Sequence, residues 1–410
     1  MGYRHCRPKG DIGTRGAALV SSTSQIAHCL GDKCYSWLET VRLRQQLKER
    51  AFQVLCDGKR MASHGIEIRG LFKIFGPKAR DYVDQVRRGL TKSELNETHG
   101  HVLGLQDINL AMPAGGITVV MGLSGSGKST LIRHINRLIE PTVGEVIYNG
   151  KDICRMNERE LREFRRLKTA MVFQKFALLP HRTVIENVLY GLDIQGVARS
   201  SSTRRGQHWI ERVGLAGFEN HYPNQLSGGM QQRVGLARAL ANDADILLMD
   251  EAYSALDPLI RVDMQTVLLD IQSELKKTVV FITHDLDEAL RLGDKIAILR
   301  DGQMIQQGKG QEIVLAPADD YIAAFVKEVN RGRVIQARTV MRPAVGALDG
   351  LKVAADETLE TVAQRLTKAE RSCAIVVDED GLEIGMLDLN TILTAMVTPA
   401  GHRGTSAALA

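Results

Sequence analysis

The sequence contains no run of about 18 consecutive apolar residues, which is the length that a helix needs to cross a bilayer. If the protein works at a membrane, another subunit must therefore carry it there. The body of the chain also lacks an excess of basic residues. The chain holds 53 Lys/Arg and 48 Asp/Glu, but residues 1–60 contribute 11 of the former and only 5 of the latter. The remaining residues are slightly acidic, which argues against nucleic acid as a partner.

Cysteines are few and do not form a metal-binding pattern. Four of the six lie in the first 60 residues, and Cys29 and Cys34 could form half of a metal site. No second ligand pair follows them at the spacing of a zinc finger. Cys154 and Cys373 stand alone, which is typical of reduced thiols in the cytosol.

Residues 1–60 also lack sustained periodicity and the apolar core of a signal peptide. We interpret them as an unassigned, disordered extension upstream of Met61, where an alternating pattern begins. The residues that follow divide into a domain at 61–330, a small unit at 335–398 and a tail at 399–410.

Short apolar runs alternate with helical patterns through most of residues 117–300. This alternation is typical of a parallel sheet flanked by helices. The strand-like runs are residues 117–121, 145–148, 170–173, 246–250, 279–283 and 296–299. A polar insert at 77–100 is expected to be helical, and Asp301-Gly302 predicts a hairpin between 296–299 and 304–307. After residue 330, a helical spacing at 359–366, a hairpin of 373–377 with 384–387 and a helix near 391–396 predict a separate β-α-β-β-α unit.

Residues 122–130, GLSGSGKST, match the phosphate-binding loop GxxxxGK[ST] between a strand and a helix. Glycines allow successive N–H groups to point into one concavity around the phosphates. Lys128 would neutralise phosphate charge, and the Ser129 hydroxyl would complete the Mg²⁺ shell. The residues expected to bind nucleotide here are Gly122, Leu123, Ser124, Gly125, Ser126, Gly127, Lys128, Ser129 and Thr130.

Two further segments carry chemistry that fits such a loop. The apolar run 246–249 ends in Asp250 and Glu251, although unpaired buried charge is costly. At the carboxyl end of a parallel strand, Asp250 would orient Mg²⁺ and Glu251 would polarise the attacking water; a strand end facing solvent is the alternative. Ser227, Gly228 and Gly229 open a helix whose dipole favours an anion, or form a plain helix cap.

In order and rough spacing, these segments together with Gln174, residues 254–257 and His284 resemble an ABC ATPase. The resemblance implies that Gln174 links the nucleotide to a membrane partner and that His284 contacts the γ-phosphate. The implied catalytic residues are Glu251, His284 and Gln174, and the implied metal-site residues are Ser129, Gln174 and Asp250. The implied nucleotide-binding residues outside the loop are Phe75, which would stack on adenine or lie in the core, Asp257, and Ser227, Gly228 and Gly229, which would bind the nucleotide of a second protomer.

Local segments also resemble the quaternary-amine importers, which take up glycine betaine, proline or choline. They are residues 70–77 with the insert that follows, 121–123, 136–142, 173–181 and 254–261, with Met230 where many ABC proteins have Gln. Residues 340–343, 356–366 and 374–387 resemble a single CBS motif. The expected fold is therefore α/β: a P-loop ABC ATPase domain with a helical signature subdomain, and a small α+β CBS-type unit.

The resemblance implies an ATP hydrolase with Mg²⁺ that powers import of glycine betaine or proline, with choline or another small solute as an alternative. Its implied partners are a second copy of the subunit, an integral-membrane permease and an external substrate-binding protein, and its place is the cytoplasmic face of the cell membrane. A soluble ABC ATPase of DNA repair would need long insertions that are not seen, and a nucleotide sensor would predict a degraded catalytic series. The transported molecule does not follow from fold and motifs.

Overall fold

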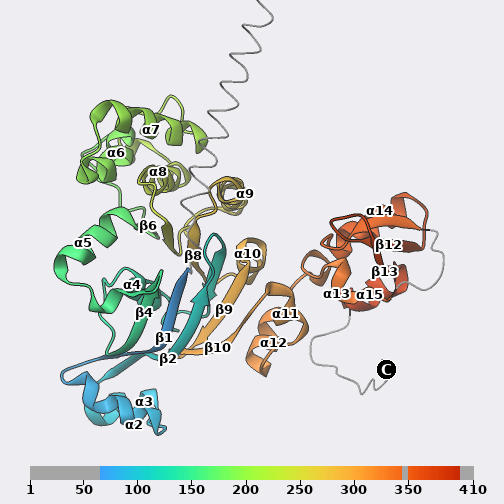
Figure 1. Cartoon of the computed structure of the whole chain (residues 1–410), viewed down its shortest axis with the longest axis horizontal. Helices are drawn as coiled ribbons and strands as arrows, with labels where there is room; N and C mark the ends of the chain where they lie inside the picture. The colour runs from blue at the N-terminus through green and yellow to red at the C-terminus, as the bar shows by residue number, and fades with distance from the viewer. Residues whose placement is uncertain (1–64, 344–349, 398–410) are drawn as a thin grey trace, which may run out of the picture. The chain divides into compact units, whose positions relative to one another are not determined.

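The computed structural model of the chain describes residues 65–343 and 350–397 (Figure 1). The extension predicted at 1–60 and the tail at 399–410 lie outside the described residues, so both assignments stay predictions. Among the described residues, no helix combines the length and the apolar character that a membrane span requires.

Six strands form the central sheet in the order β10-β9-β3-β8-β7-β6. Their bounds are β3 Ile117–Met121, β6 Thr169–Phe173, β7 Ile246–Asp250, β8 Thr278–Thr283, β9 Lys295–Arg300 and β10 Gln303–Gly308. Every neighbouring pair is parallel except β9 with β10. The inner strands β3, β7 and β8 are buried on both faces, which is why each is a continuous apolar run. The predicted parallel sheet and the hairpin at Asp301-Gly302 are confirmed.

A second, antiparallel sheet has the order β2-β1-β4-β5. Its strands are β1 Ile66–Phe75, β2 Val102–Met112, β4 Val143–Tyr148 and β5 Lys151–Asp152. The assignment of residues 145–148 to the parallel sheet is therefore wrong, since Tyr148 pairs with Ile66 in antiparallel register. A short apolar run does not specify the direction of its partner strand, so periodicity alone could not separate the two sheets.

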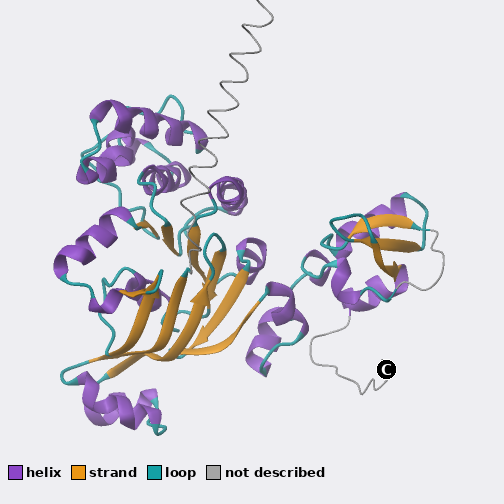
Figure 2. Cartoon of the chain, viewed as in Figure 1, coloured by secondary structure: helices purple, strands orange, loops and turns teal. Residues whose placement is uncertain are grey.

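Helices flank the central sheet or pack on one another (Figures 1 and 2). Their bounds are α4 Lys128–Ile135, α5 Glu158–Leu167, α6 Val184–Gln195, α7 Arg199–Arg212, α8 Gly228–Ala241, α9 Pro258–Leu275, α10 Leu286–Leu292, α11 Gly310–Leu315 and α12 Asp320–Val326. Helices α6, α7 and α8 contact one another, which confirms the predicted helical subdomain. Short 3-10 turns lie at Ile153–Arg155 and Pro223–Gln225.

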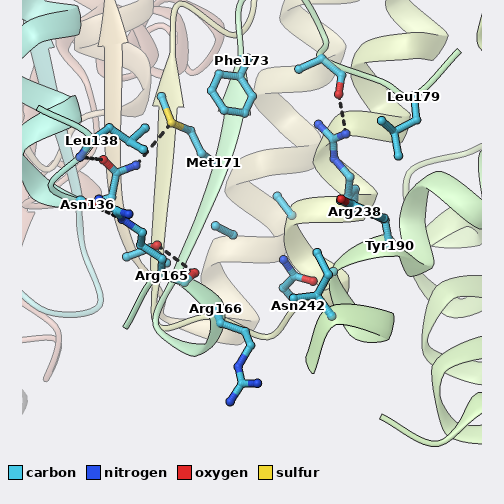
Figure 3. Close-up of a pocket in the computed structure, with 16 residues that line it drawn as sticks. Asn136, Leu138, Arg165, Arg166, Met171, Phe173, Leu179, Tyr190, Arg238 and Asn242 are labelled. Carbon is cyan, nitrogen blue, oxygen red and sulfur yellow. Dashed lines mark hydrogen bonds between the residues drawn. The ribbon is translucent and has the colours of Figure 1, made fainter. Parts of the chain in front are cut away.

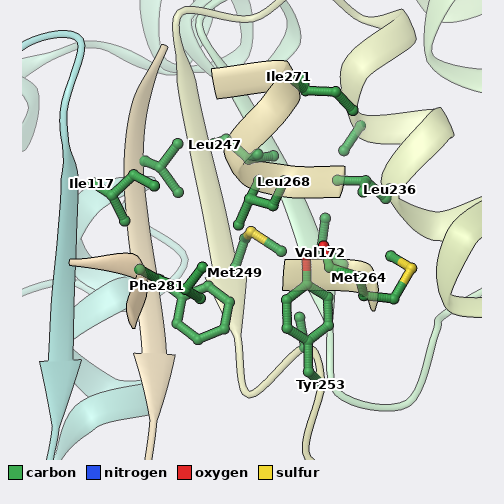
Figure 4. Packing of buried hydrophobic residues seen from close by; sticks show 14 of the residues in the cluster. Ile117, Val172, Leu236, Leu247, Met249, Tyr253, Met264, Leu268, Ile271 and Phe281 are labelled. Atoms are coloured by element: carbon green, nitrogen blue, oxygen red, sulfur yellow. Dashed lines mark hydrogen bonds between the residues drawn. The ribbon is translucent and has the colours of Figure 1, made fainter. Parts of the chain in front are cut away.

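The two faces of the central sheet bury different clusters, because successive side chains of a strand point in opposite directions. Val119 and Phe281 belong to the cluster that includes residues of α6 to α10, whereas Val120 and Ile282 belong to the one that includes α4, α5 and the antiparallel sheet. Figure 4 shows the first cluster, in which the rings of Tyr253 and Phe281 lie 5.4 Å apart. The strand ends that carry the site therefore stand on a packed core.

The insert between β1 and β2 is helical, as predicted. It contains the 3-10 turn Ala79–Tyr82, α2 Val83–Arg87 and α3 Lys92–His99. Thr91 and Glu94 form a capping box at the start of α3, in which each side chain bonds the other residue's backbone N–H.

The C-terminal unit also has the predicted order of elements. After a 3-10 turn at Arg331–Arg333, it contains α13 Ala337–Val340, β11 Leu351–Ala354, α14 Leu359–Lys368, β12 Cys373–Val377, β13 Glu383–Asp388 and α15 Leu389–Val397. β11 pairs in parallel with β12, which pairs antiparallel with β13. A small cluster that includes Leu359, Val362 and Leu366 of α14 forms its core.

Candidate active site

The loop predicted to bind phosphate connects β3 to α4, and two of its glycines are required by space. Gly122 has a φ of +146°, and a Cβ there would lie 2.1 Å from the carbonyl oxygen of Leu299. Gly127 has a φ of +101°, and a Cβ there would lie 2.8 Å from the carbonyl oxygen of Gly104. No side chain caps α4, so its first N–H groups can serve an anion.

Lys128 occupies the inside of this loop. Its side chain is only 4% exposed, and Nζ donates to the carbonyl oxygens of Gly122 at 2.8 Å and Leu123 at 2.9 Å. Burial lowers the pKa of the Lys128 ammonium below its ordinary value, although the carboxylates of Glu251 and Asp250 oppose the shift. Besides these two carboxylates, a bound phosphate would supply a further anionic partner for this buried cation.

The remaining loop residues differ in their exposure to solvent. Leu123, Ser124 and Gly125 are exposed, whereas Ser129 and Thr130 are partly buried at the start of α4. The Ser126 hydroxyl is buried and has no hydrogen-bond partner. An unpaired buried hydroxyl in this loop fits a site that takes an anion.

Ser129 and Asp250 come together as predicted. The Ser129 hydroxyl donates to Asp250 Oδ1 at 2.8 Å, and Asp250 is 6% exposed. These two oxygens are of the kind that Mg²⁺ prefers, and the described residues hold no group of three or more His, Cys, Asp and Glu that could enclose a metal alone. A metal that shares its shell with phosphates and water fits this donor set. Sequence reasoning missed Arg133, which lies 3.5 Å from Asp250 Oδ2 and one helical turn beyond Ser129.

Glu251 stands at the centre of the other predicted residues. Its Oε1 lies 3.8 Å from Lys128 Nζ, and its Oε2 accepts from Gln174 Nε2 at 3.1 Å and lies 3.9 Å from His284 Nδ1. The residue has a φ of +47°, a backbone conformation that residues other than glycine rarely adopt. Its backbone is held there by the bond from Glu251 N–H to the Ile282 carbonyl at 3.2 Å. A strained backbone conformation persists only where the surrounding structure enforces it, and such conformations are frequent at functional sites.

Ser254 is a further member that the sequence did not single out by itself. Its hydroxyl donates to the Glu251 carbonyl at 2.9 Å and accepts a hydrogen bond from Gln174 Nε2 at 3.3 Å. Asp257, three residues on, caps α9 by accepting the Ile260 N–H. The loop that leads from β7 to α9 thus also contacts Gln174, which follows the end of β6.

Residues Ser227, Gly228 and Gly229 stand apart from this group. Ser227 caps α8 by accepting the Met230 N–H at 3.3 Å, as predicted. Gly229 is closely packed, since a Cβ there would meet the Ile260 side chain at 2.8 Å. Among the described residues, no hydrogen bond or ion pair joins these three residues to the phosphate-binding loop.

Phe75 lies close to that loop. A Cβ on Gly104 would meet the Phe75 ring at 2.8 Å, and Gly104 in turn abuts Gly127. The Phe75 side chain is 39% exposed and has Lys73 Nζ 4.9 Å from its centroid. Its exposure contradicts the alternative of a core aromatic and leaves the ring open to stacking.

A groove of about 410 Å³ lies between α5 and β6 on one side and α6 and α8 on the other (Figure 3). It is lined by Asn136, Leu138, Arg165, Arg166, Thr169, Ala170, Met171, Phe173, Ala177, Leu179, Tyr190, Gly191, Ile194, Arg238, Ala239 and Asn242. Arg238 reaches from α8 to the carbonyl oxygens of Ala177 and Phe176. Burial lowers the pKa of the Arg238 guanidinium below its ordinary value. The loop after Gln174 therefore forms one wall of this groove.

The part of the chain that contains the phosphate-binding loop matches a model of a known protein family. Residues 105–254 match the family model described as ABC transporter. The chain is 51% identical over 279 residues to the glycine betaine transport ATP-binding protein OpuAA of Bacillus subtilis, covering 68% of this chain and 67% of that protein. It is 47% identical over 325 residues to the glycine betaine/carnitine transport ATP-binding protein GbuA of Listeria monocytogenes, covering 78% of this chain and 80% of that protein.

Solved structures agree with the sequence relatives. The dimeric structure of MJ0796, a bacterial ABC transporter cassette, superposes with a TM-score of 0.51 at 33% identity, covering 60% of this chain and 98% of that one. A post-hydrolysis dimer of the same cassette, bound to ADP and Pi, gives the same values.

Proposed function

Because the chain belongs to the family of ABC transporter ATP-binding proteins, we propose that it hydrolyses ATP to power import of glycine betaine or proline through a separate permease. The observation that carries this function is the convergence of Lys128, Asp250, Glu251 and His284 at adjacent strand ends, in a chain whose relatives are glycine betaine transport ATP-binding proteins. Choline is the alternative substrate. The described residues do not decide between these molecules, because this subunit need not touch the transported molecule.

The contacts suggest a role for each side chain of the site. Phe75 stacks on the adenine, while the loop N–H groups and Lys128 hold the phosphates. Mg²⁺, placed by Ser129 and Asp250, would neutralise charge on the transferring phosphoryl group. Glu251 accepts a hydrogen bond from the attacking water and takes its proton, and His284 donates to the γ-phosphate.

Ser227, Gly228 and Gly229 are assigned to a nucleotide held by a second copy of the chain. Their separation from the loop of their own chain supports this assignment, as does the dimeric state of the related MJ0796 cassette. The helix dipole of α8 then faces the γ-phosphate from the opposite side. A two-fold dimer of this kind contains two composite sites. Asp257 lies in the loop that would meet the partner.

The groove beside Gln174 is the proposed contact for the permease. Tyr190 and Ile194 of α6 are 37% and 52% exposed on its rim, and Leu138 is 53% exposed. An apolar groove walled by the loop after Gln174 can transmit docking of a permease helix to Glu251 through the Gln174 side chain. This contact would place the chain on the cytoplasmic face of the cell membrane. An external binding protein would deliver the substrate.

Replacing Ile194 by Glu is expected to abolish stimulation by the permease while leaving basal hydrolysis unchanged. A charge in an apolar contact costs about 2 kcal/mol or more of docking energy, so association weakens about 30-fold. The measurement is ATP hydrolysis with and without permease and substrate-loaded binding protein in liposomes. Phe218→Glu, an exposed apolar residue outside the groove, is the matched control. Full stimulation of the Ile194→Glu protein would place the permease elsewhere.

We assign residues 335–398 to a single CBS-like regulatory unit, separate from the ATPase domain at 61–330. No predicted site residue lies beyond His284, and the unit has its own small core. Paired with the same unit of a second copy, it would act as an ionic or ligand-set brake on hydrolysis. A small core of this size is marginal alone, which favours pairing.

Truncation after Asn330 tests this assignment. Basal hydrolysis should survive, because the site is complete without the unit, whereas dependence on internal salt should disappear. The readout is hydrolysis against salt concentration in permease-containing liposomes. Unchanged salt dependence in the truncated protein would refute the brake. If truncation only weakened the dimer, the unit would be a purely structural dimer clamp, which is the alternative.

A further inference from the structure

The loops that carry Glu251 and His284 leave neighbouring strands, and one side chain of α9 contacts both. Arg261 donates through one terminal nitrogen to the carbonyl oxygen of Leu256, at 3.2 Å. Its other terminal nitrogen lies 3.4 Å from Asp285 Oδ2, in an ion pair. Leu256 belongs to the loop that follows Glu251, and Asp285 follows His284 directly. A planar guanidinium suits such a bridge because its donors diverge in fixed directions.

A second contact lies one helical turn further along α9. Gln265 Nε2 donates to Glu288 Oε1 at 3.1 Å, and Arg291 donates to Gln265 Oε1 at 2.9 Å. Gln265 and Glu288 are 4% and 6% exposed. A buried carboxylate is costly to retain unless its partners are fixed, so this contact defines how α9 and α10 pack.

The contacts close a ring around the catalytic pair. Ser254 bonds the Glu251 carbonyl, Arg261 bonds the Leu256 carbonyl two residues on, and Asp285 continues to His284. Asp285 itself is fixed, since its backbone N–H donates to the Thr283 hydroxyl at 3.0 Å and its Oδ1 accepts the Glu288 N–H at 3.1 Å. The ring thus links the two backbone segments whose side chains place Glu251 Oε2 and His284 Nδ1 3.9 Å apart.

We propose that Arg261 is a positioning residue for ATP hydrolysis, which holds the turn of His284 against the loop of Glu251, with the Gln265–Glu288 contact as its support. Arg261 touches neither phosphate nor water in this role. The inference rests on the proposed ATPase function. Because nucleotide is bound chiefly by the phosphate-binding loop and Phe75, loss of the bridge should affect turnover and spare binding.

Arg261→Gln is therefore expected to lower kcat about 10- to 100-fold, the size of effect that follows from a misplacement of about 1 Å. KM for ATP should stay within about threefold of the wild-type value, since ground-state contacts are intact. Arg261→Lys keeps the charge beside Asp285 but cannot bond both loops, so its kcat should be intermediate. Glu274→Gln is the control: Glu274 lies on the same helix in an exposed ion pair with Arg212 at 2.7 Å and should have wild-type kcat.

The experiment measures kcat and KM of the full chain with its permease, for these variants, the wild type and Glu251→Gln together, at a temperature where circular dichroism shows each to be folded. If the wild type hydrolyses ATP and Glu251→Gln abolishes this activity, the proposed function stands. If kcat of Arg261→Gln is then unchanged, or if only its KM is raised, the positioning role is overturned. If wild type itself does not hydrolyse ATP, the proposed function fails instead. If Arg261→Gln does not fold, Arg261→Lys and Glu288→Gln decide: the proposal requires a lower kcat in both.

Discussion

Replacing Glu251 by Gln is expected to slow ATP hydrolysis about 10²- to 10⁴-fold, the contribution of a general base. Gln has the same size and can still accept from Gln174 Nε2, so the site keeps its shape. Its amide cannot take the proton of the attacking water. Lys128 and Ser129 are untouched, so ATP and Mg²⁺ should bind with near wild-type affinity. An ATP-bound dimer should therefore accumulate.

Two measurements check this expectation: phosphate release with purified permease present, and the elution volume of the protein in ATP and Mg²⁺. Glu274→Gln, which removes a carboxylate on the exposed side of α9, should turn over normally and remain monomeric under the same conditions. Turnover of Glu251→Gln near the wild-type rate would exclude Glu251 as the base.

Replacing Lys128 by Ala should instead weaken nucleotide binding. The Nζ is buried inside the loop, where it has only carbonyl oxygens and carboxylates as neighbours. A charge-assisted hydrogen bond contributes about 1.5–3 kcal/mol, so affinity should fall about 10- to 100-fold. Hydrolysis at limiting ATP should fall with it.

Titration with a fluorescent ATP analogue gives the dissociation constant directly. Lys151→Ala is the control, because Lys151 forms an exposed ion pair with Glu160 at 2.7 Å, away from the site. Equal affinity of the Lys128→Ala protein and the wild type would show that the lysine does not hold phosphate. Only the backbone N–H groups of the loop would then support its assignment as the phosphate-binding loop.

The phosphate-binding loop, Asp250 and Glu251 could be placed from sequence because each occupies a fixed point relative to a parallel strand. The pattern of Gly122, Gly127 and Lys128 has a geometric cause, and the structure shows it in the close approach of both glycines to neighbouring carbonyls. The hairpin and the helices of the C-terminal unit could also be predicted, because turn residues and helical spacing are local signals in the sequence.

Other features could not be predicted because they depend on distant residues. The antiparallel direction of β4 is set by its pairing with β1, about 75 residues earlier, and leaves no local signal. The positive φ of Glu251 and the bridge from Arg261 to Asp285 likewise arise from tertiary contacts. An exposed Phe75 and a core Phe75 have the same sequence pattern, so burial alone decided between them.

The most direct test of transport powered by this site is uptake of labelled glycine betaine into liposomes that hold the permease, with binding protein on one side and this chain with ATP and Mg²⁺ on the other. The predicted result is accumulation that requires ATP, stops with Glu251→Gln and is reduced by unlabelled proline. ATP hydrolysis without accumulation of glycine betaine, proline or choline, or equal accumulation with Glu251→Gln, would contradict it.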